Sequence, residues 1–344
     1  MAEIGGTFVI AEAGVNHNGS LDLALRLVEV AAEAKADAVK FQTFRADRLA
    51  SAAAPKAEYQ SDHTGGGTQL SMLRQLELSD DDHRAVVRHC CELGIEFMST
   101  PFDAGSAEFL VELGMRRIKV PSGELTNKPF IEHLAGLGKS LVVSTGMATL
   151  EEVKEALSWI KAVHDRRLLT TPVTLLHCTS NYPAAPDDVN LRAMATLASE
   201  TGFPVGYSDH TNGIAVATAA VALGATVIEK HFTLDRNLPG PDHQASLEKA
   251  ELVAMVDAIR VVERCLGNGQ KEPRATEWAM RDIARRSLTL VKEMKTGDHL
   301  QAGDIEILRP GNGIAPKFVK EIMGRRLARD LPMGTTLQWS DLRE

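Results

Sequence analysis

The chain has 344 residues and a formal net charge of −8, from 46 acidic and 38 basic side chains, and this excess of negative charge argues against nucleic acid as a partner. Hydrophobic residues make up 44% of it, no apolar run reaches the length of a membrane span, and the start MAEIGGTFVI lacks the basic segment of a secretory signal. Its four cysteines form no CxxC pair, so we expect a cytoplasmic globular protein with no membrane contact, no disulfide framework and no zinc knuckle.

Eight short apolar runs recur along the chain, and nearly every one ends in polar residues capable of chemistry. In chain order the runs are Phe8–Glu12, Ala38–Phe41, Glu96–Ser99, Arg117–Val120, Leu141–Ser144, Val173–His177, Pro204–Ser208 and Thr226–Glu229. Continuous apolar runs of this length are typical of buried parallel strands. Because parallel barrels bind ligands at the carboxyl ends of their strands, the eight polar endings predict one active site ringed by loops.

Helical patterns separate these runs. Ser20 precedes one such pattern, Ser79 stands before three aspartates, and Thr149 begins a T-L-E-E segment; each is a helix-capping signal. Strand and helix alternate about every 30 residues as far as Leu266, which is the spacing of βα units. The sequence therefore predicts an α/β protein with a (β/α)8 TIM barrel over residues 1–266. A doubly wound open sheet is the alternative, with less support because no GxGxxG follows any of the runs.

The pattern changes after Leu266. We expect a linker over residues 267–282 and a small second domain over residues 283–344. In that domain the pattern G-x-x-L-Q-x-x-D-[IL] occurs twice, beginning at Gly297 and at Gly334, which indicates an internal duplication. From Ile283 onward there are 11 basic and 8 acidic residues, so a basic domain follows an acidic body and could bring a cation to an anionic ligand.

Two histidines follow the last two runs: His210 comes after the seventh and His231 after the eighth. Alone, either residue would more often be a hydrogen-bonded structural histidine. Together, at one rim of a barrel, the two imidazoles can share a metal ion, with Asp209 and Glu229 as hydrogen-bond acceptors beside them. Two nitrogen ligands leave positions for water and a substrate oxygen, which suits a Lewis acid better than a closed structural zinc site.

Two lysines, Lys40 and Lys119, lie within apolar runs, where an unpaired ammonium group is costly. Hydroxyl groups surround them in the predicted rim, from Thr100, Ser122 and Ser208. Two cations among hydroxyls favour a bound phosphate or carboxylate, although a Schiff base or a purely structural role is also open to either lysine. Residue type does not choose a proton carrier among four carboxylates, namely Glu12, Glu124, Glu229 and Asp242.

Ten blocks of sequence, in order, resemble the sialic acid synthase family: AEAGVNHNGSL, VKFQTF, STPFD, KVPSGE, STGM, LLHCTSNYP, GYSDHT, ALGATVIEKHFTLDR, PGPDHQAS and RPGNGI. The resemblance covers almost the whole chain, and its last part is similar to the family's antifreeze-like (SAF) domain. It implies a TIM barrel followed by a small β-clip domain. It also implies a synthase that condenses phosphoenolpyruvate with an amino sugar and water to give a nonulosonic acid and phosphate.

The resemblance implies a ligand for each group of residues. The family's counterparts of His210 and His231 bind a divalent metal, usually manganese, with magnesium or cobalt as alternatives. Phosphoenolpyruvate is held by the counterparts of Lys40, Thr100, Lys119, Ser122 and Ser208. The amino sugar contacts the counterparts of Gln42, Tyr182 and Asp242. Arg309 matches an arginine that a neighbouring subunit inserts over the sugar's N-acetyl group, which implies a domain-swapped homodimer.

Two residues are the predicted catalytic groups. Lys119 neutralises charge on phosphoenolpyruvate, and Glu124 is our first choice for moving protons. The chain also departs from the family's pattern. Ser180 stands where the family has a phosphoenolpyruvate-binding asparagine, and Pro121 replaces a frequent glycine before Ser122. The contact at residue 180 is therefore weakened or remade, and the loop at residue 121 is stiffened.

Two stretches bear on the choice of sugar. APKAEYQ and QLSMLRQLELS, within and after residues 51–69, resemble bacterial legionaminic acid synthases more than N-acetylneuraminate synthases. The resemblance implies an N-acetylmannosamine-type sugar; the alternative is a legionaminic or pseudaminic acid synthase that uses a 2,4-diacetamido-trideoxyhexose. Two further hypotheses are a Schiff-base aldolase acting through Lys119, and a sugar- or ice-binding protein. Metal-dependent release of phosphate would distinguish the synthase from both.

Overall fold

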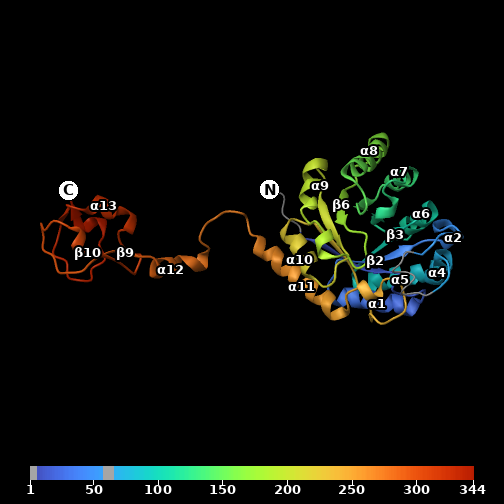
Figure 1. The fold of residues 1–344 in the computed structure, drawn as a ribbon, viewed down its shortest axis with the longest axis horizontal. Helices are drawn as coiled ribbons and strands as arrows, with labels where there is room; N and C mark the ends of the chain where they lie inside the picture. The colour runs from blue at the N-terminus through green and yellow to red at the C-terminus, as the bar shows by residue number, and fades with distance from the viewer. Residues whose placement is uncertain (1–5, 57–65) are drawn as a thin grey trace. The chain divides into compact units, whose positions relative to one another are not determined.

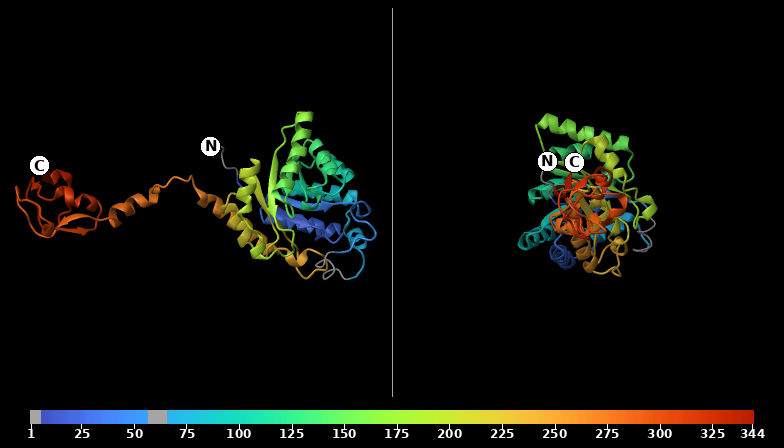
Figure 2. Two further views of the ribbon diagram at one scale, coloured as in Figure 1. Left: turned by 45° about the horizontal axis from the view of Figure 1, so that its top comes forward. Right: turned by 90° about the vertical axis from the view of Figure 1, so that its left-hand side faces the viewer.

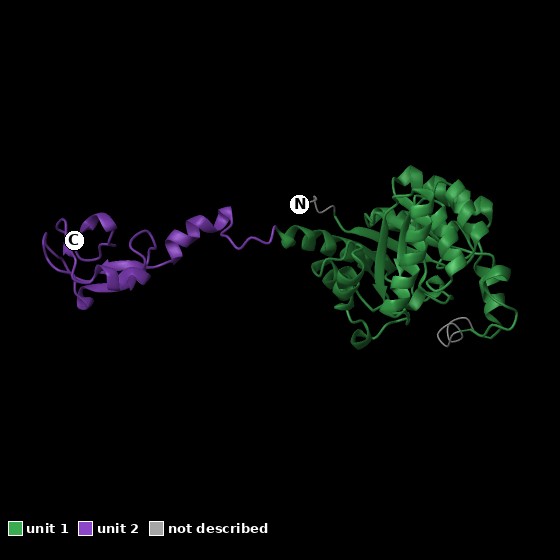
Figure 3. Ribbon diagram, turned by 90° about the horizontal axis from the view of Figure 1, so that it is seen from above, with its two compact units in different colours: residues 1–267 green, residues 268–344 purple. Residues whose placement is uncertain are grey.

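The computed structural model describes residues 6–56 and 66–344, and the chain divides into two compact units, Met1–Gly267 and Asn268–Glu344 (Figure 3). Each unit has a hydrophobic core of its own. The large core of the first unit runs from Val9 to Ile259, and that of the second from Leu288 to Leu337. Part of the stretch that bears on the choice of sugar, residues 57–65, lies outside the described residues.

The first unit is a closed barrel of eight parallel strands that follow one another in chain order (Figures 1 and 2). The strands are β1 Phe8–Gly14, β2 Ala38–Thr43, β3 Glu96–Pro101, β4 Arg117–Val120, β5 Ser140–Ser144, β6 Val173–Cys178, β7 Val205–Asp209 and β8 Val227–His231. The last strand pairs with the first, with Phe8 opposite Val227, and this pairing closes the barrel. Every predicted apolar run is a strand, and the TIM-barrel prediction is confirmed.

A helix follows each strand and covers the outside of the barrel (Figure 1). These helices are α1 Leu21–Glu33, α5 Asp80–Leu93, α6 Ala104–Glu112, α7 Lys128–Gly136, α8 Leu150–Arg167, α9 Ala193–Thr201, α10 Ala215–Ala222 and α11 Lys249–Leu266. The predicted caps form: Ser20 accepts a hydrogen bond from the Leu23 amide, and Thr149 accepts one from the Glu152 amide. Capping satisfies amides that the first turn of a helix leaves without partners.

Side chains inside the barrel change from apolar to polar along the strands. Six apolar residues fill the lower interior, namely Ile10, Ala38, Met98, Val142, Leu176 and Val227. Successive side chains of a strand point to opposite faces, so the next inward-facing residue lies two positions further on. Those residues are Glu12, Lys40, Thr100, Ser144, Cys178 and Glu229. The lower interior of the barrel is therefore apolar, and a layer of polar groups lies above it at the carboxyl ends of the strands.

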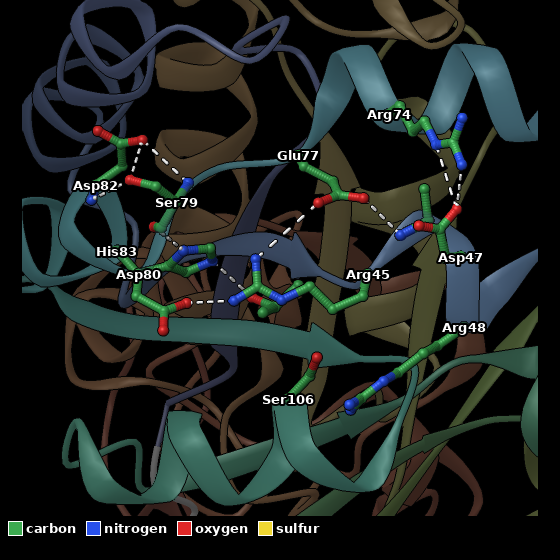
Figure 4. Close-up of polar contacts among 12 residues, drawn as sticks. Arg45, Asp47, Arg48, Arg74, Glu77, Ser79, Asp80, Asp82, His83 and Ser106 are labelled. Atoms are coloured by element: carbon green, nitrogen blue, oxygen red, sulfur yellow. Dashed lines mark hydrogen bonds and ion pairs between the residues drawn. The ribbon is translucent and has the colours of Figure 1, made fainter.

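The connection between β2 and β3 is held by polar contacts (Figure 4). It contains helices α2 Ala46–Leu49 and α4 Gln69–Leu76 ahead of α5. Arg45 forms an ion pair with Asp80 at 2.5 Å. The buried His83 of α5 donates from Nδ1 to the Ser79 carbonyl at 2.8 Å, and its Nε2 lies 2.9 Å from the Thr43 hydroxyl of β2. These contacts hold the start of α5 against β2, the strand that carries Lys40.

The second unit is built from short elements, which are α12 Ala275–Ala284, β9 Ser287–Leu290, β10 Ile305–Leu308, α13 Val319–Ile322, β11 Arg326–Leu327 and β12 Leu342–Arg343. β9 pairs with β10 and β11 with β12, both antiparallel. Both copies of the repeated sequence pattern form the same hydrogen bond. The Gln301 amide donates to Asp304 Oδ2 at 2.9 Å, and the Gln338 amide donates to Asp341 Oδ2 at the same distance. The predicted internal duplication is therefore present in the fold.

None of the helices formed by residues 6–56 and 66–344 combines the length and the apolar content that crossing a bilayer requires.

Candidate active site

The strand register brings polar side chains from distant parts of the chain to one level of the barrel. Glu12 lies opposite Lys40 of β2 on one side and His231 of β8 on the other, and Ser208 lies opposite Glu229. Above this level is a cavity of about 260 Å³. Ten of the thirteen residues predicted for the site line it, namely Lys40, Gln42, Thr100, Lys119, Ser122, Ser180, Tyr182, Ser208, His210 and His231.

A buried network of opposite charges forms the floor of the cavity. The Lys40 ammonium lies 2.7 Å from Glu12 Oε2 and 3.6 Å from Glu229 Oε2, and it donates to the Thr100 hydroxyl at 3.0 Å. Lys119 lies 3.4 Å from Glu229 Oε1. The two lysines are thus matched by two carboxylates, which explains how ammonium groups are tolerated in strands so thoroughly buried.

The two carboxyl groups of this network differ in pKa, and that of Glu12 is the higher. Burial raises the pKa of the Glu12 carboxyl to about 7, against the opposing effect of Lys40 and with the help of the nearby Glu229. Burial acts in the same direction on Glu229, but Lys119, Lys40 and the Ser208 hydroxyl outweigh it and lower that pKa to about 2. Near neutral pH one carboxyl therefore exchanges a proton while the other stays ionised. With Glu12 protonated, the two ammonium groups exceed the remaining carboxylate by one charge, which favours an anion.

Two imidazoles face each other at the same rim. The rings of His210 and His231 have centroids 5.6 Å apart, and the Tyr182 ring lies 4.1 Å from that of His210. His210 Nδ1 donates to the Thr179 carbonyl at 2.7 Å, which leaves the lone pair on Nε2. Burial lowers the pKa of His210 to about 4 and holds the pKa of His231 well below its usual value. Both rings are therefore neutral, the form that binds a metal.

The donor set fits a divalent cation with open coordination positions. His231 Nδ1 is buried and has no hydrogen-bond partner, as expected of a nitrogen whose partner is an ion. Within the described part of the chain, no group of three or more histidine, cysteine or carboxylate side chains is arranged to hold a metal. The expected acceptor Asp209 binds Thr211 and Lys230, and the Thr179 carbonyl orients His210 in its place.

Three predicted site residues are not among those that line the cavity. Glu124 lies in the turn after β4, where its carboxylate accepts a hydrogen bond from Asn127 Nδ2 at 2.7 Å. Asp242 is buried in the segment after β8, and burial raises its pKa to about 6. Arg309 belongs to the second unit, where its Nε donates to the Ala284 carbonyl at 3.0 Å. The roles predicted for these three residues stay predictions.

Glu12 is one of the four carboxylates that the sequence left open as proton carriers, and Glu124 was preferred to it. The signal was available in the strand phase, because Glu12 follows the inward-facing Ile10 by two positions and pairs with Lys40 across the sheet. Gly14, two residues later, sits where the register of β1 shifts, with φ of +53°. This left-handed backbone conformation favours glycine, whereas a Cβ there would make only ordinary van der Waals contacts, at 3.4 Å from Glu12 Oε1 and His231 Cε1.

Comparisons with known proteins point in one direction. A model described as the NeuB family matches residues 27–271, and a SAF domain model matches residues 285–343. The chain is 51% identical to an N,N'-diacetyllegionaminic acid synthase of Legionella pneumophila, over 97% of this chain and 94% of that protein. It is 46% identical to an N,N'-diacetyllegionaminic acid synthase of Campylobacter jejuni, over 93% and 95%.

A solved structure shares both fold and sequence. It is an N-acetylneuraminic acid (sialic acid) synthetase from Leptospira borgpetersenii serovar Hardjo-bovis, crystallised in complex with citrate. The TM-score is 0.70 and the sequence identity 35%, and the match covers 80% of this chain and 90% of that one.

Proposed function

This chain belongs to the NeuB family and carries a SAF domain, and from that premise we propose that it joins phosphoenolpyruvate to a 2,4-diacetamido-trideoxyhexose to give N,N'-diacetyllegionaminic acid and phosphate. The enzyme class, a synthase of nonulosonic acids, follows from the family and from relatives that cover nearly the whole chain. The choice of sugar is supported by the two legionaminic acid synthases among them. N-acetylmannosamine is the second candidate, supported by the similar sialic acid synthetase structure.

The observation that carries the proposal is the convergence of two buried lysines, a ring of hydroxyls and two neutral imidazoles on one cavity. Phosphoenolpyruvate has two anionic groups, and Lys40 and Lys119 supply one ammonium group for each. Ser122 and Ser180 add hydroxyl groups, while Ser208 donates to Glu229 Oε1 at 2.8 Å; the family's asparagine at position 180 is replaced by a shorter side chain that can still donate. Binding is favoured when Glu12 is protonated, because the site then carries a net positive charge.

The reaction makes one carbon–carbon bond and breaks one carbon–oxygen bond. C3 of phosphoenolpyruvate bonds to the aldehyde carbon of the open-chain sugar, water adds to C2, and phosphate leaves with the former enol oxygen. The two protons of the water end on the new hydroxyl and on phosphate. The pKa of Glu12, raised to about 7 by burial, suits it to carry one of these protons near neutral pH. Glu124 remains our candidate for the other transfer.

His210 and His231 would hold the divalent metal of this reaction, with manganese as first choice and magnesium or cobalt as alternatives. When bound, such an ion polarises the aldehyde oxygen and makes its carbon electrophilic. The supporting observations are the neutral state of both rings and the unpartnered His231 Nδ1. The Tyr182 ring contacts that of His210 at a tilt of 33°, with the centroids 4.1 Å apart.

Sugar recognition is proposed for four residues, namely Gln42, Tyr182, Asp242 and Arg309. The first two line the cavity beside the histidines. Arg309 has an exposed side chain on the SAF domain, and we propose that in a domain-swapped homodimer it contacts the sugar bound by the partner subunit. Such a contact would bring a cation from the basic second domain to the more acidic barrel.

The test is release of inorganic phosphate from phosphoenolpyruvate with a panel of sugars. We expect turnover with the 2,4-diacetamido-trideoxyhexose of the manno series, and weaker or no turnover with N-acetylmannosamine and its 6-phosphate. A chelator should abolish release and manganese should restore it. His231→Ala should lower kcat at least about a hundredfold, the order of loss expected when one ligand of a catalytic metal is removed. His164→Ala, at the far end of α8, is the control.

Two outcomes would overturn the proposal. Turnover that survives both the chelator and His231→Ala would remove the metal from the mechanism. Covalent trapping of Lys119 by borohydride in the presence of pyruvate, without phosphate release from any sugar, would instead establish the Schiff-base aldolase.

A further inference from the structure

A second and larger cavity, of about 660 Å³, lies beside the candidate active site. It is open to solvent and lies at the carboxyl ends of β5 and β6, between the loops that lead into α8 and α9. The two cavities share three lining residues, Met147, Cys178 and Ser180. They are therefore neighbours separated by a thin wall.

Glycine, serine and cysteine residues form this wall together with Met147. The Gly146 amide donates to Ser122 Oγ at 3.0 Å, and Ser122 Oγ lies 3.2 Å from Cys178 Sγ. A Cβ on Gly146 would lie 2.3 Å from Ser180 Oγ, which glycine alone avoids. Met147, the next residue, has φ of +63°, a costly conformation for a side chain of this kind. A strained loop thus keeps a thin, hydroxyl-lined boundary between the cavities.

The second cavity is lined by one arginine and one aspartate, Arg192 and Asp188, and no ion pair joins them. The Arg192 side chain is exposed, and its guanidinium makes no hydrogen bond or ion pair with any residue in the described ranges 6–56 and 66–344. Amide donors from Asn181 and Asn190 lie in the same lining, with one carboxylate, that of Asp188. A guanidinium with five donors and no partner is suited to a tetrahedral oxyanion.

The position of the cavity indicates which anion it would receive. In an eight-stranded barrel β5 and β6 lie opposite β1 and β2, so this cavity is on the far side of the site from Glu12, Lys40 and Gln42. Ser122 and Ser180 line the candidate active site together with Lys119. An anionic group held by these three residues would lie next to the wall of the second cavity.

Accepting the proposed function, we propose that the second cavity is a receiving site for the inorganic phosphate released by the reaction, with Arg192 as its principal cation. Phosphate passes the hydroxyls of Ser122 and Ser180 and is held by Arg192 before it enters solvent. The sugar product leaves separately, past Tyr182 and the histidines. The site takes inorganic phosphate and has no role in binding phosphoenolpyruvate.

The first experiment measures binding of inorganic phosphate to the full-length protein by 31P NMR titration, without substrates. Arg192→Ala should weaken binding about tenfold, the value of one charged hydrogen-bonding partner. Arg192→Lys should keep most of the affinity because the charge remains. Arg166→Ala removes an exposed arginine at the opposite end of α8 and should leave binding unchanged. Equal losses in Arg192→Ala and Arg166→Ala would show unspecific attraction and overturn the inference.

The second experiment measures product inhibition during turnover. Arg192→Ala should raise the inhibition constant of phosphate about tenfold and leave KM for phosphoenolpyruvate within twofold of the parent. A parallel rise in KM would place Arg192 in the substrate site and overturn the inference. The two proposals can be contradicted separately. Absence of turnover with every sugar contradicts the proposed function, whereas an unchanged phosphate affinity in Arg192→Ala contradicts only the receiving site.

Discussion

Lys230 and Asp209 form a fully buried ion pair on the outer side of the barrel, with Nζ 2.9 Å from Oδ2. The lysine also donates to the Thr211 carbonyl, and Asp209 Oδ1 accepts from the Thr211 amide and hydroxyl. Each member of the pair is adjacent in sequence to one of the two site histidines, His210 and His231. The pair therefore joins the ends of β7 and β8 directly behind the imidazoles.

We predict that Lys230→Met destabilises the protein by about 3–5 kcal/mol, because Asp209 would remain buried with no counter-charge. Lys249→Met is the matched control. Its ion pair with Glu33 lies between two exposed side chains and should contribute less than about 1 kcal/mol. Urea unfolding of the two variants gives the comparison, and equal losses would contradict the importance of burial.

Asp242 predicts a pH dependence of stability. Burial raises its pKa to about 6, from an ordinary value of 3.8, so the folded state disfavours the ionised carboxyl. The contribution of Asp242 to the free energy of unfolding is most favourable below pH 3.8 and is lost as the pH rises through 6. Because asparagine cannot ionise, Asp242→Asn should gain in relative free energy of unfolding between pH 4 and pH 8, by at most about 3 kcal/mol.

Urea unfolding of Asp242→Asn at both pH values measures this gain. Asp257→Asn, which removes an exposed carboxylate of α11, is the control. A difference between Asp242→Asn and the parent that does not change with pH would contradict the effect of burial.

Helix α5 begins with a capping box, and residues of its first turns also contact the barrel. Ser79 accepts a hydrogen bond from the Asp82 amide at 3.1 Å, and Asp82 Oδ2 accepts one from the Ser79 amide at 3.0 Å (Figure 4). Three aspartates in the first turn add favourable interactions with the helix dipole. The Ser79 carbonyl also holds His83, which contacts β2 through Thr43.

Ser79→Ala should therefore cost about 1 kcal/mol in the free energy of unfolding, the usual value of a lost N-cap. Ser158→Ala, at an exposed position within α8, should be neutral or slightly stabilising because alanine has the higher helix propensity. Thermal unfolding of both variants is the measurement. A loss for Ser158→Ala as large as that for Ser79→Ala would show that capping is not the cause.

The two units of the molecule have separate hydrophobic cores, so the proposed swapped homodimer can be tested by complementation. Arg309→Ala should raise KM for the sugar, and His231→Ala should lower kcat at least about a hundredfold. When the two variants are co-expressed, half of the dimers are mixed, and each mixed dimer contains one intact site made by both subunits. Activity should then return to about a quarter of the parent value.

If Arg309 acted within its own subunit, the mixed dimers would contain no intact site and activity would not return. Size-exclusion chromatography of the parent protein checks the dimer itself.

Local sequence was sufficient for the strands, the helix caps and the duplicated pattern at Gly297 and Gly334. Each of these depends on a period, a cap or a backbone preference that operates within a few residues. The repeated strand–helix spacing also determined the barrel, because eight βα units of similar length have few other ways to bury their strands. Lys40, Lys119 and the two histidines were found in the same way, as polar groups at apolar strand ends.

Only the tertiary structure decided which carboxyl group accompanies the lysines. Glu12, Glu124 and Glu229 all stand near a strand end in the sequence, yet the inward phase of β1 and β8 brings Glu12 and Glu229 to Lys40 while Glu124 binds Asn127. The place of the proton depends on burial and on distances between strands far apart in the chain. Those quantities, like the cavity beside Arg192, exist only once the barrel has closed, because they are set by neighbours in space.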